Sequence, residues 1–162
     1  MNFCFWPNNP SGEFEYDSMT RNLEKVLIKD PEFFTCDRLI DVTEEWLREH
    51  VFALPKDNKF CLVNERARIL NEVGYVIKTE FDSSFYEFVK RANFSCPKFV
   101  ENIVKHFSGF RDEAIYNGDQ IFFYKRAQIL CSDLIGAWSD KEHEINFSDT
   151  QQLTMFADYR VP

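Results

Sequence analysis

Apolar residues recur at helical spacing between positions 62 and 77, and no other stretch constrains the fold as strongly. They share one broad face of a helix, whereas Glu65, Arg68 and Glu72 fall on the side that faces water. The apolar set is Leu62, Val63, Ile69, Leu70, Val73, Val76 and Ile77. The pattern predicts a long amphipathic helix whose apolar face is buried.

Four further helices are indicated by apolar spacing and by the residues that begin or end them. One runs from Phe14 to Asp30, where the following proline stops it. Thr43 is placed to cap a second helix, residues 82–84 cap a third, and Pro97 suits the first position of a fourth. The low content of 5 Gly and 6 Pro argues against a β-sandwich rich in tight turns. We therefore predict an all-α, mainly helical fold that forms a single domain over residues 1–162.

Two signals conflict around the segment 121–138 (IFFYKRAQILCSDLIGAW): the residues before it indicate a turn, and its own period indicates a helix. Asn117-Gly118 is a strong turn pair, and its commonest meaning is a β-hairpin. The segment is nevertheless too long for one strand, and it keeps a 3.6-residue period. Its periodic residues are Ile129, Leu130, Leu134 and Trp138. We predict a buried helix over the whole of 121–138.

The net charge of -8 restricts the partners that the chain can bind. Proteins that grip long nucleic acids usually carry a basic face that offsets the phosphate charge. Direct binding of polymeric nucleic acid is therefore disfavoured. A small phosphorylated ligand remains possible, because a few local cations suffice to hold it.

The cysteine and histidine patterns give no metal site. The 5 cysteines are spread without a CxxC pair, and His50, His106 and His143 share no metal-ligand spacing. The first residues, MNFCFWPNNP, resemble neither a signal peptide nor a membrane span. We expect a cytoplasmic protein with reduced, structural thiols and no membrane association.

Polar side chains interrupt the apolar segment FFYKRAQIL. Lys125 and Gln128 are three residues apart and share one helix face, which Ser132 extends, whereas Arg126 lies on a different line. A functional stripe is one interpretation. A solvated stripe whose long side chains cover apolar surface is the other, and spacing alone favours it.

A second interruption is Asp158 in LTMFADYRVP. Its neighbours Phe156 and Tyr159 are compatible with a carboxylate held beside an aromatic pocket. The alternative is an N-cap for a helix that begins at Tyr159 and Arg160, and N-cap aspartates are common enough to favour this alternative.

Taken in order, the sequence blocks resemble a known family. These blocks are NFCFW, GEFEYDSMTRNLEKVL, VTEEWL, NERARILNEVG, FRDEAIYNGDQIFFYKRAQIL and LTMFADYRVP. They closely resemble the queuosine salvage protein family, the queuosine 5′-phosphate N-glycosylase/hydrolases, over essentially the whole chain. The YKRAQIL and LTMFADYR blocks are highly specific, whereas the helices between them are generic.

The resemblance implies an activity and a fold. Members of this family hydrolyse the N-glycosidic bond of queuosine 5′-monophosphate and release queuine for reuse in tRNA modification. The implied fold is a helical domain similar to DNA glycosylases, and the substrate is a mononucleotide, in agreement with the acidic charge. No metal or organic cofactor is implied.

The resemblance also implies site residues. The catalytic aspartate of the family's FADYR motif corresponds to Asp158, and the motif phenylalanine that contacts the base corresponds to Phe156. Lys125 matches a lysine expected near the ribose or the phosphate. Tyr159, Arg160 and Arg126 match further motif positions, and we expect them in the substrate site without individual roles.

Departures from the family pattern lead to a second hypothesis. The family extends upstream of NFCFW, with a histidine that contacts the ligand, and continues beyond FADYRVP into a further helical portion that helps to hold the base. We therefore expect residues 1–162 to be part of a longer domain, incomplete at both ends. The alternative function is a non-catalytic helical fragment that binds a nucleotide, queuine or a protein partner.

Overall fold

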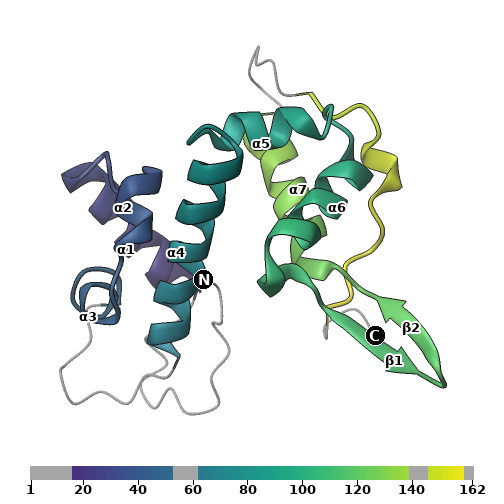
Figure 1. Cartoon of the computed structure of the whole chain (residues 1–162), viewed down its shortest axis with the longest axis horizontal. Helices are drawn as coiled ribbons and strands as arrows, with labels where there is room; N and C mark the ends of the chain where they lie inside the picture. The colour runs from purple at the N-terminus through teal and green to yellow at the C-terminus, as the bar shows by residue number, and fades with distance from the viewer. Residues whose placement is uncertain (1–15, 53–61, 139–145, 159–162) are drawn as a thin grey trace. The chain divides into compact units, whose positions relative to one another are not determined.

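The computed structural model describes residues 16–52, 62–138 and 146–158, which are coloured along the chain in Figure 1. Within these ranges the chain is mostly helical, with one small two-stranded sheet. This confirms the predicted mainly helical class. None of the helices in these ranges is long and apolar enough to cross a membrane.

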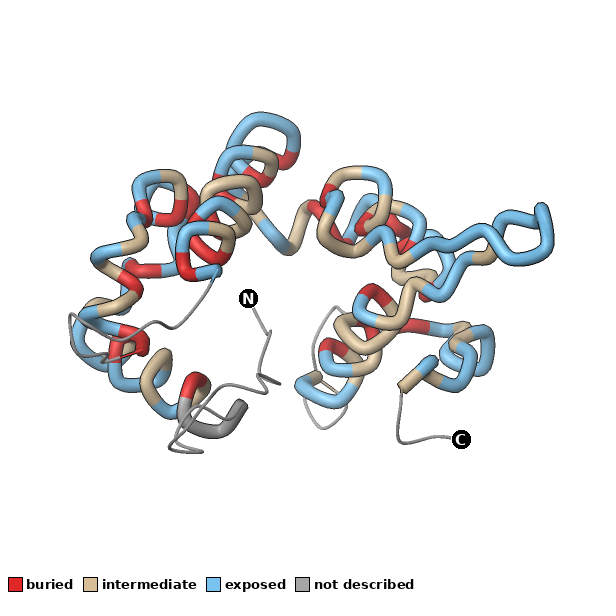
Figure 2. The backbone as a smooth tube through the Cα atoms, turned by 90° about the horizontal axis from the view of Figure 1, so that it is seen from below, coloured by how far each residue is buried: buried red, intermediate tan, exposed pale blue. Residues whose placement is uncertain are grey.

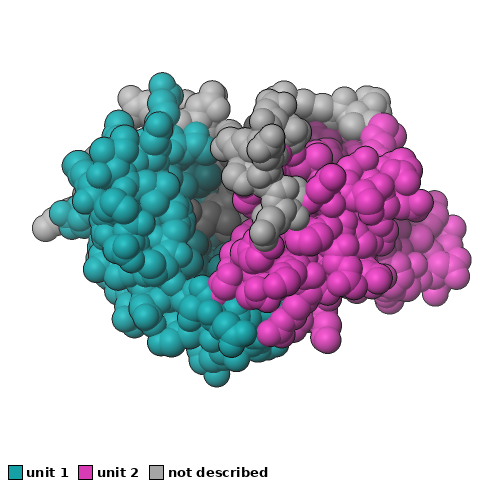
Figure 3. Space-filling model, turned by 90° about the horizontal axis from the view of Figure 1, so that it is seen from above, with its two compact units in different colours: residues 1–83 teal, residues 84–162 magenta. Residues whose placement is uncertain are grey.

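The chain divides into two compact units, Met1–Ser83 and Ser84–Pro162, which are coloured separately in Figure 3. Each unit is described below by itself. That residues 1–162 form a single domain of a longer protein stays a prediction.

The described residues of the first unit form four α-helices and a π-helical turn. They are α1 (Tyr16–Lys29), α2 (Cys36–Ile40), α3 (Glu44–Trp46), η1 (Leu47–Val51) and α4 (Val63–Glu80). The predicted cap at Thr43 is confirmed, because its hydroxyl oxygen accepts a hydrogen bond from the backbone N–H of Trp46 at 3.1 Å. The placement of Leu62 on the buried face is wrong. Leu62 precedes α4 in a left-handed conformation with φ 57°, and it is 42% exposed.

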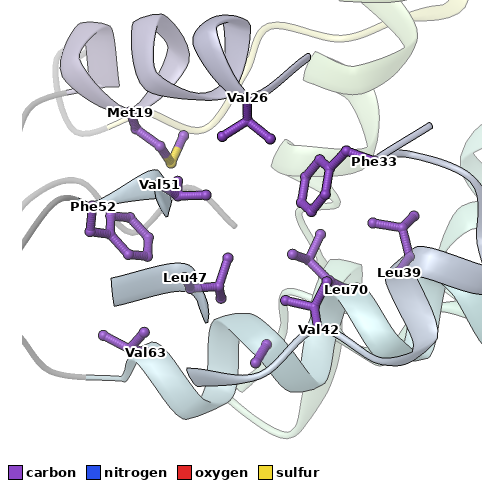
Figure 4. Close-up of a cluster of buried hydrophobic side chains, with 11 residues drawn as sticks. Met19, Val26, Phe33, Leu39, Val42, Leu47, Val51, Phe52, Val63 and Leu70 are labelled. Atoms are coloured by element: carbon purple, nitrogen blue, oxygen red, sulfur yellow. The ribbon is translucent and has the colours of Figure 1, made fainter. Parts of the chain in front are cut away.

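A cluster of buried hydrophobic side chains joins the elements of this unit (Figure 4). Its members come from α1, α2, η1 and α4, or from the loops between the elements. They are Met19, Val26, Phe33, Leu39, Val42, Leu47, Val51, Phe52, Val63, Ala67 and Leu70. The broad apolar face predicted for α4 thus forms one wall of the core, although Leu62 is not part of it.

The backbone of α2 lies directly against α4 at Gly74. A Cβ atom at this position would lie 2.8 Å from Leu39 Cβ and 2.9 Å from the carbonyl oxygen of Cys36. Nearby, the side-chain amide of Asn71 donates to the carbonyl oxygens of Leu39 and Val42, at 2.8 and 3.1 Å. These bonds connect α4 to the carbonyl groups at and just after the end of α2, where the carbonyl oxygen of Leu39 also accepts from the N–H of Val42 at 3.4 Å.

In the second unit, residues 84–138 and 146–158 form three α-helices, two short 3-10 turns and a hairpin. In chain order they are α5 (Phe85–Arg91), α6 (Cys96–His106), η2 (Ser108–Phe110), β1 (Glu113–Tyr116), β2 (Asp119–Phe122), α7 (Lys125–Trp138) and η3 (Thr150–Gln152). The predicted cap before α5 is confirmed, since the Ser84 hydroxyl oxygen accepts a hydrogen bond from the N–H of Glu87. Pro97 lies in the first turn of α6 but at its second position, because the helix begins at Cys96.

The hairpin corrects the prediction of a helix over all of 121–138. Residues 121 and 122 belong to β2, which pairs antiparallel with β1, and α7 begins only at Lys125. Asn117 and Gly118 have φ values of 52° and 91°, which the tight turn requires and which few other residue pairs adopt readily. The local turn therefore overrides the helical period for the first four residues of the segment.

The hairpin projects beyond the helices of its unit and is largely exposed (Figures 1 and 2). The helices bury an aromatic cluster instead. Phe88 packs against Phe99 and Phe107, with ring centroids 5.7 and 5.8 Å apart. Phe147 contacts Phe99 at 5.8 Å and so joins the segment after α7 to the core formed by α5 and α6.

Candidate active site

The start of α7 is held by Asp112, the residue before β1, and by Glu113, the first residue of β1. The N–H of Lys125 donates to Oδ2 of Asp112 at 2.9 Å, so a side chain thirteen residues earlier caps this helix. Tyr124 immediately before it has the left-handed φ of 47°, which is uncommon for a residue with a side chain. Its hydroxyl group donates to Glu113 Oε1 at 3.3 Å. Burial, followed by the charge of Glu113, raises the pKa of Tyr124, so its hydroxyl keeps the proton that this bond needs.

The segment after α7 returns to the helices and is fixed first at Asp149. Its Oδ1 accepts from the N–H of Cys96 at 2.7 Å, and its Oδ2 accepts from the Ser95 hydroxyl at 2.8 Å. Asp149 thereby caps α6 from more than fifty residues away. The backbone N–H of Cys96, and then the Ser95 hydroxyl, lower the pKa of Asp149 because both bonds favour the ionised carboxylate.

Residues 153–158, which we call the strap, have no regular secondary structure and lie against α7 through Gln128. Oε1 of Gln128 accepts two hydrogen bonds from Thr154, one from its N–H at 2.8 Å and one from its hydroxyl at 3.0 Å. Nε2 of the same side chain donates to the carbonyl oxygen of Phe123 at 3.1 Å. One amide thus connects the strap, α7 and the residues between β2 and α7.

The strap ends at an ion pair. Nζ of Lys125 lies 2.7 Å from Oδ2 of Asp158, and the two residues are 33 positions apart in the sequence. Their side chains are 28% and 34% exposed, so the pair is partly removed from water. Asp158 also donates its N–H to the carbonyl oxygen of Phe156 at 2.7 Å, which makes a tight turn in the backbone before it. The contact between Lys125 and Asp158 is a charge-assisted hydrogen bond, which is stronger than a hydrogen bond between neutral groups.

The structure brings together some of the expected site residues. Lys125 and Asp158 are in direct contact, and the half-buried Phe156 lies two residues before the carboxylate. Arg126 is exposed, and one step along α7 turns its side chain about 100° away from that of Lys125. Tyr159 and Arg160 lie outside the described residues, as does the helix start that Asp158 would cap in the alternative interpretation.

Gln128 is a contact residue that sequence reasoning did not place in the site. It shares a helix face with Lys125, but its partner Thr154 is 26 residues away and gave no signal. A polar residue three positions from a candidate lysine, inside an apolar helix, was the one available sign. Spacing alone favoured a solvated stripe for this face, whereas here Lys125 and Gln128 both bond to residues of the strap.

This arrangement offers one carboxylate held at a fixed place beside a cation. Burial raises the pKa of the Cys96 and Cys131 thiols, which keeps them protonated and poor nucleophiles. In the described parts of the chain, no group of three or more His, Cys, Asp or Glu side chains is placed to hold a metal ion. Asp158 is the carboxylate that this arrangement holds in direct contact with the ammonium group of Lys125.

Comparison with known proteins gives a consistent result. The family model described as "Queuosine salvage protein" matches residues 1–162. A relative from Dictyostelium discoideum is 45% identical over 162 residues, which are 100% of this chain and 48% of the relative. Relatives from Sphaerobacter thermophilus and Bos taurus are 35% and 32% identical over all of this chain and about half of their own length. Each of these relatives is named queuosine 5′-phosphate N-glycosylase/hydrolase.

The chain spans about half the length of the curated relatives that it matches. The match nevertheless extends over every residue of the chain, including the strap and the first turn of α7. The chain therefore belongs to the queuosine salvage protein family.

Proposed function

We propose that this chain contributes the catalytic carboxylate, Asp158, to hydrolysis of the N-glycosidic bond of queuosine 5′-phosphate. Two observations support the proposal. The relatives carry the name of this activity. Within the chain, the 2.7 Å contact between Lys125 and Asp158 joins the two sequence blocks that most specifically resemble the family.

The reaction explains why a carboxylate is needed. Cleaving the bond between ribose and base builds positive charge on the sugar, as in the hydrolysis of glycosides. A carboxylate near that carbon stabilises the charge or attacks the carbon, and a partly dry site strengthens its effect. Water then completes the reaction, so the products are queuine and ribose 5-phosphate. Phe156 is the residue that we propose to contact the base, with Arg126, Tyr159 and Arg160 in the same substrate site.

The first experiment measures release of the base from queuosine 5′-phosphate by chromatography. It compares the 162-residue chain with a chimera in which this chain replaces the matching stretch of the Dictyostelium discoideum relative. We expect Asp158→Asn to lower kcat at least about 100-fold in any form that is active, since it removes the charge that stabilises the transition state. Asp133→Asn, a change of the same type at an exposed position of α7, serves as the control. Equal activity of Asp158→Asn and the parent protein contradicts the proposal.

A comparison of two substrates separates two proposed roles of Lys125, binding the phosphate and holding Asp158. We propose that it binds the 5′-phosphate after leaving Asp158, because a phosphate attracts an ammonium group more strongly than one carboxylate does. Lys125→Met is then expected to raise KM for queuosine 5′-phosphate about 10-fold or more, with a smaller effect on the nucleoside queuosine. An equal loss with both substrates instead assigns Lys125 to holding Asp158.

The second candidate function is binding without turnover. The half-length match to the relatives favours it for the chain taken alone. Binding of queuosine 5′-phosphate by the 162-residue chain, measured by calorimetry, together with base release by the chimera alone, supports this function for the isolated chain.

We also propose that the protein acts in the cytoplasm. Cys36, Cys96 and Cys131 are buried free thiols, which suits a reducing compartment. Fractionation of cells that express a tagged form tests this, and recovery in a secreted or membrane fraction contradicts it.

A further inference from the structure

We propose that Gln128 is a positioning residue for Asp158, acting through Thr154. The inference rests on the proposed function, because it needs Asp158 to be the reacting carboxylate. It adds a residue whose side chain has no bond to Asp158 among the contacts described above.

The first step is the geometry of the strap. Its residues have no helix or strand ladder to hold them, so side chains must fix their path. Gln128 does this with both ends of its amide. The oxygen accepts the N–H and the hydroxyl of Thr154, and the nitrogen donates to Phe123, so the amide has a single orientation.

The second step is the distance from Thr154 to Asp158. Four residues of extended chain reach about 13 Å, whereas Lys125 and Gln128 are separated by only about 4.5 Å along α7. The strap bends at the turn that joins Asp158 N–H to the carbonyl oxygen of Phe156. With Thr154 fixed at Gln128, the bend directs Asp158 to Lys125. With Thr154 released, this constraint on the path of the strap to Asp158 is lost.

The third step is the expected kinetic effect. A shift of about 1 Å in a reacting group can cost about 100-fold in rate. Because Gln128 is proposed to act on Asp158 and not on the nucleotide, its loss lowers kcat and leaves KM nearly unchanged. A residue that only stabilises the fold lowers the folded fraction instead, which thermal unfolding detects.

Three variants separate these effects. Gln128→Met keeps the volume of the side chain and removes its three hydrogen bonds. Gln128→Glu keeps the oxygen that accepts from Thr154, removes the donor to Phe123 and adds a negative charge. Gln151→Ala, at an exposed position of η3, is the matched control.

Two measurements are made on each variant, in the 162-residue chain and in the chimera. The first is kcat and KM for queuosine 5′-phosphate. We expect kcat to fall about 10- to 100-fold in Gln128→Met and to recover most of this loss in Gln128→Glu. The second is amide hydrogen exchange of Thr154 by NMR, which we expect to be at least about 10-fold faster in Gln128→Met than in the parent chain.

The results that overturn the inference are distinct from failure of the proposed function. If the parent forms release the base and Gln128→Met matches their kcat, the positioning role is wrong. The same holds if exchange at Thr154 does not change. If no parent form releases the base, the proposed function fails, and the positioning role fails with it, whatever the exchange at Thr154 reports about the contact.

Discussion

The lack of a side chain at Gly74 allows α4 to touch the backbone of α2. An added methyl group would meet Leu39 Cβ at 2.8 Å and backbone atoms of α2 at 2.9 Å. Backbone atoms cannot turn aside as the end of a flexible side chain can. The two helices would have to separate.

We therefore expect Gly74→Ala to destabilise the first unit by about 1–3 kcal/mol, the usual range for an overpacked core. Gly136→Ala in α7 is the control, since nothing lies within 4 Å of its added Cβ. That change is expected to stabilise the protein by about 0.5–1 kcal/mol, as alanine favours a helix over glycine. Urea unfolding measures the free energy of unfolding of both variants. An equal change in Gly74→Ala and Gly136→Ala contradicts the close contact at Gly74.

Asp149 makes the second unit sensitive to acid. The pKa of Asp149 is lowered in the folded state, so folding favours its ionised form. The resulting stabilisation is complete above the ordinary pKa of an aspartate, about 3.9, and is lost as the pH falls through the lower folded value.

Between pH 7 and pH 3, the parent chain is expected to lose more stability than Asp149→Asn, which has no carboxylate to protonate. At pH 7 the variant is expected to be the less stable of the two. Thermal unfolding across this pH range measures the difference, with Asp133→Asn as the control. Parallel curves for the parent and Asp149→Asn mean that the cap contributes no acid sensitivity.

At the level of elements, the hairpin shows where local chemistry decides the structure. Two strands alone are marginally stable in water, and most residues of β1 and β2 are exposed. The pairing of β1 with β2 therefore depends largely on the turn at Asn117 and Gly118. The φ of 91° at Gly118 lies in the region that side chains rarely adopt.

Gly118→Ala is expected to cost about 1–2 kcal/mol and to weaken the pairing of β1 with β2. Cross-strand NMR contacts between Ala114 and Ile121, which are paired in the sheet, report the change. Gly109→Ala is the control, because its added Cβ meets no atom within 4 Å and its φ is not positive. Retention of these cross-strand contacts in Gly118→Ala would show that the turn does not determine the pairing.

The elements that could be predicted from the sequence have signals within a few residues. The caps at Thr43 and Ser84 and the apolar face of α4 are examples. The five-residue helix α2 is too short to show a period, and a helical period hid the last two residues of β2.

In the candidate site, too, the sequence predicts some features and not others. The resemblance to the family selected Lys125 and Asp158 separately. Their contact depends on how the strap folds back onto α7, and no local pattern encodes a pairing across 33 residues. The buried Arg66, whose guanidinium carbon lies 5.3 Å from the ring centroid of Phe52, is likewise visible only in the folded chain.

At the scale of the whole molecule, the net charge of -8 opposes binding to polyanions. We expect a dissociation constant for unmodified tRNA above about 100 µM at physiological salt, weaker than ordinary nonspecific binding. Filter binding at low and physiological salt measures it, with a basic RNA-binding protein as the positive control. Tight binding that weakens steeply with salt would instead favour an enzyme that acts on polymeric nucleic acid.

The long-range cap at Asp149 has a consequence for synthesis of the chain. Ser95 leaves the ribosome 54 residues before the carboxylate that it will bond. At about 5–20 residues per second, this delay lasts about 3–11 s. During that time the first turn of α6 lacks its cap, and Phe99 lacks the ring of Phe147. Part of the aromatic surface of the nascent second unit is therefore exposed during this delay. A pause in translation just before residue 147 would prolong its exposure to chaperones and proteases.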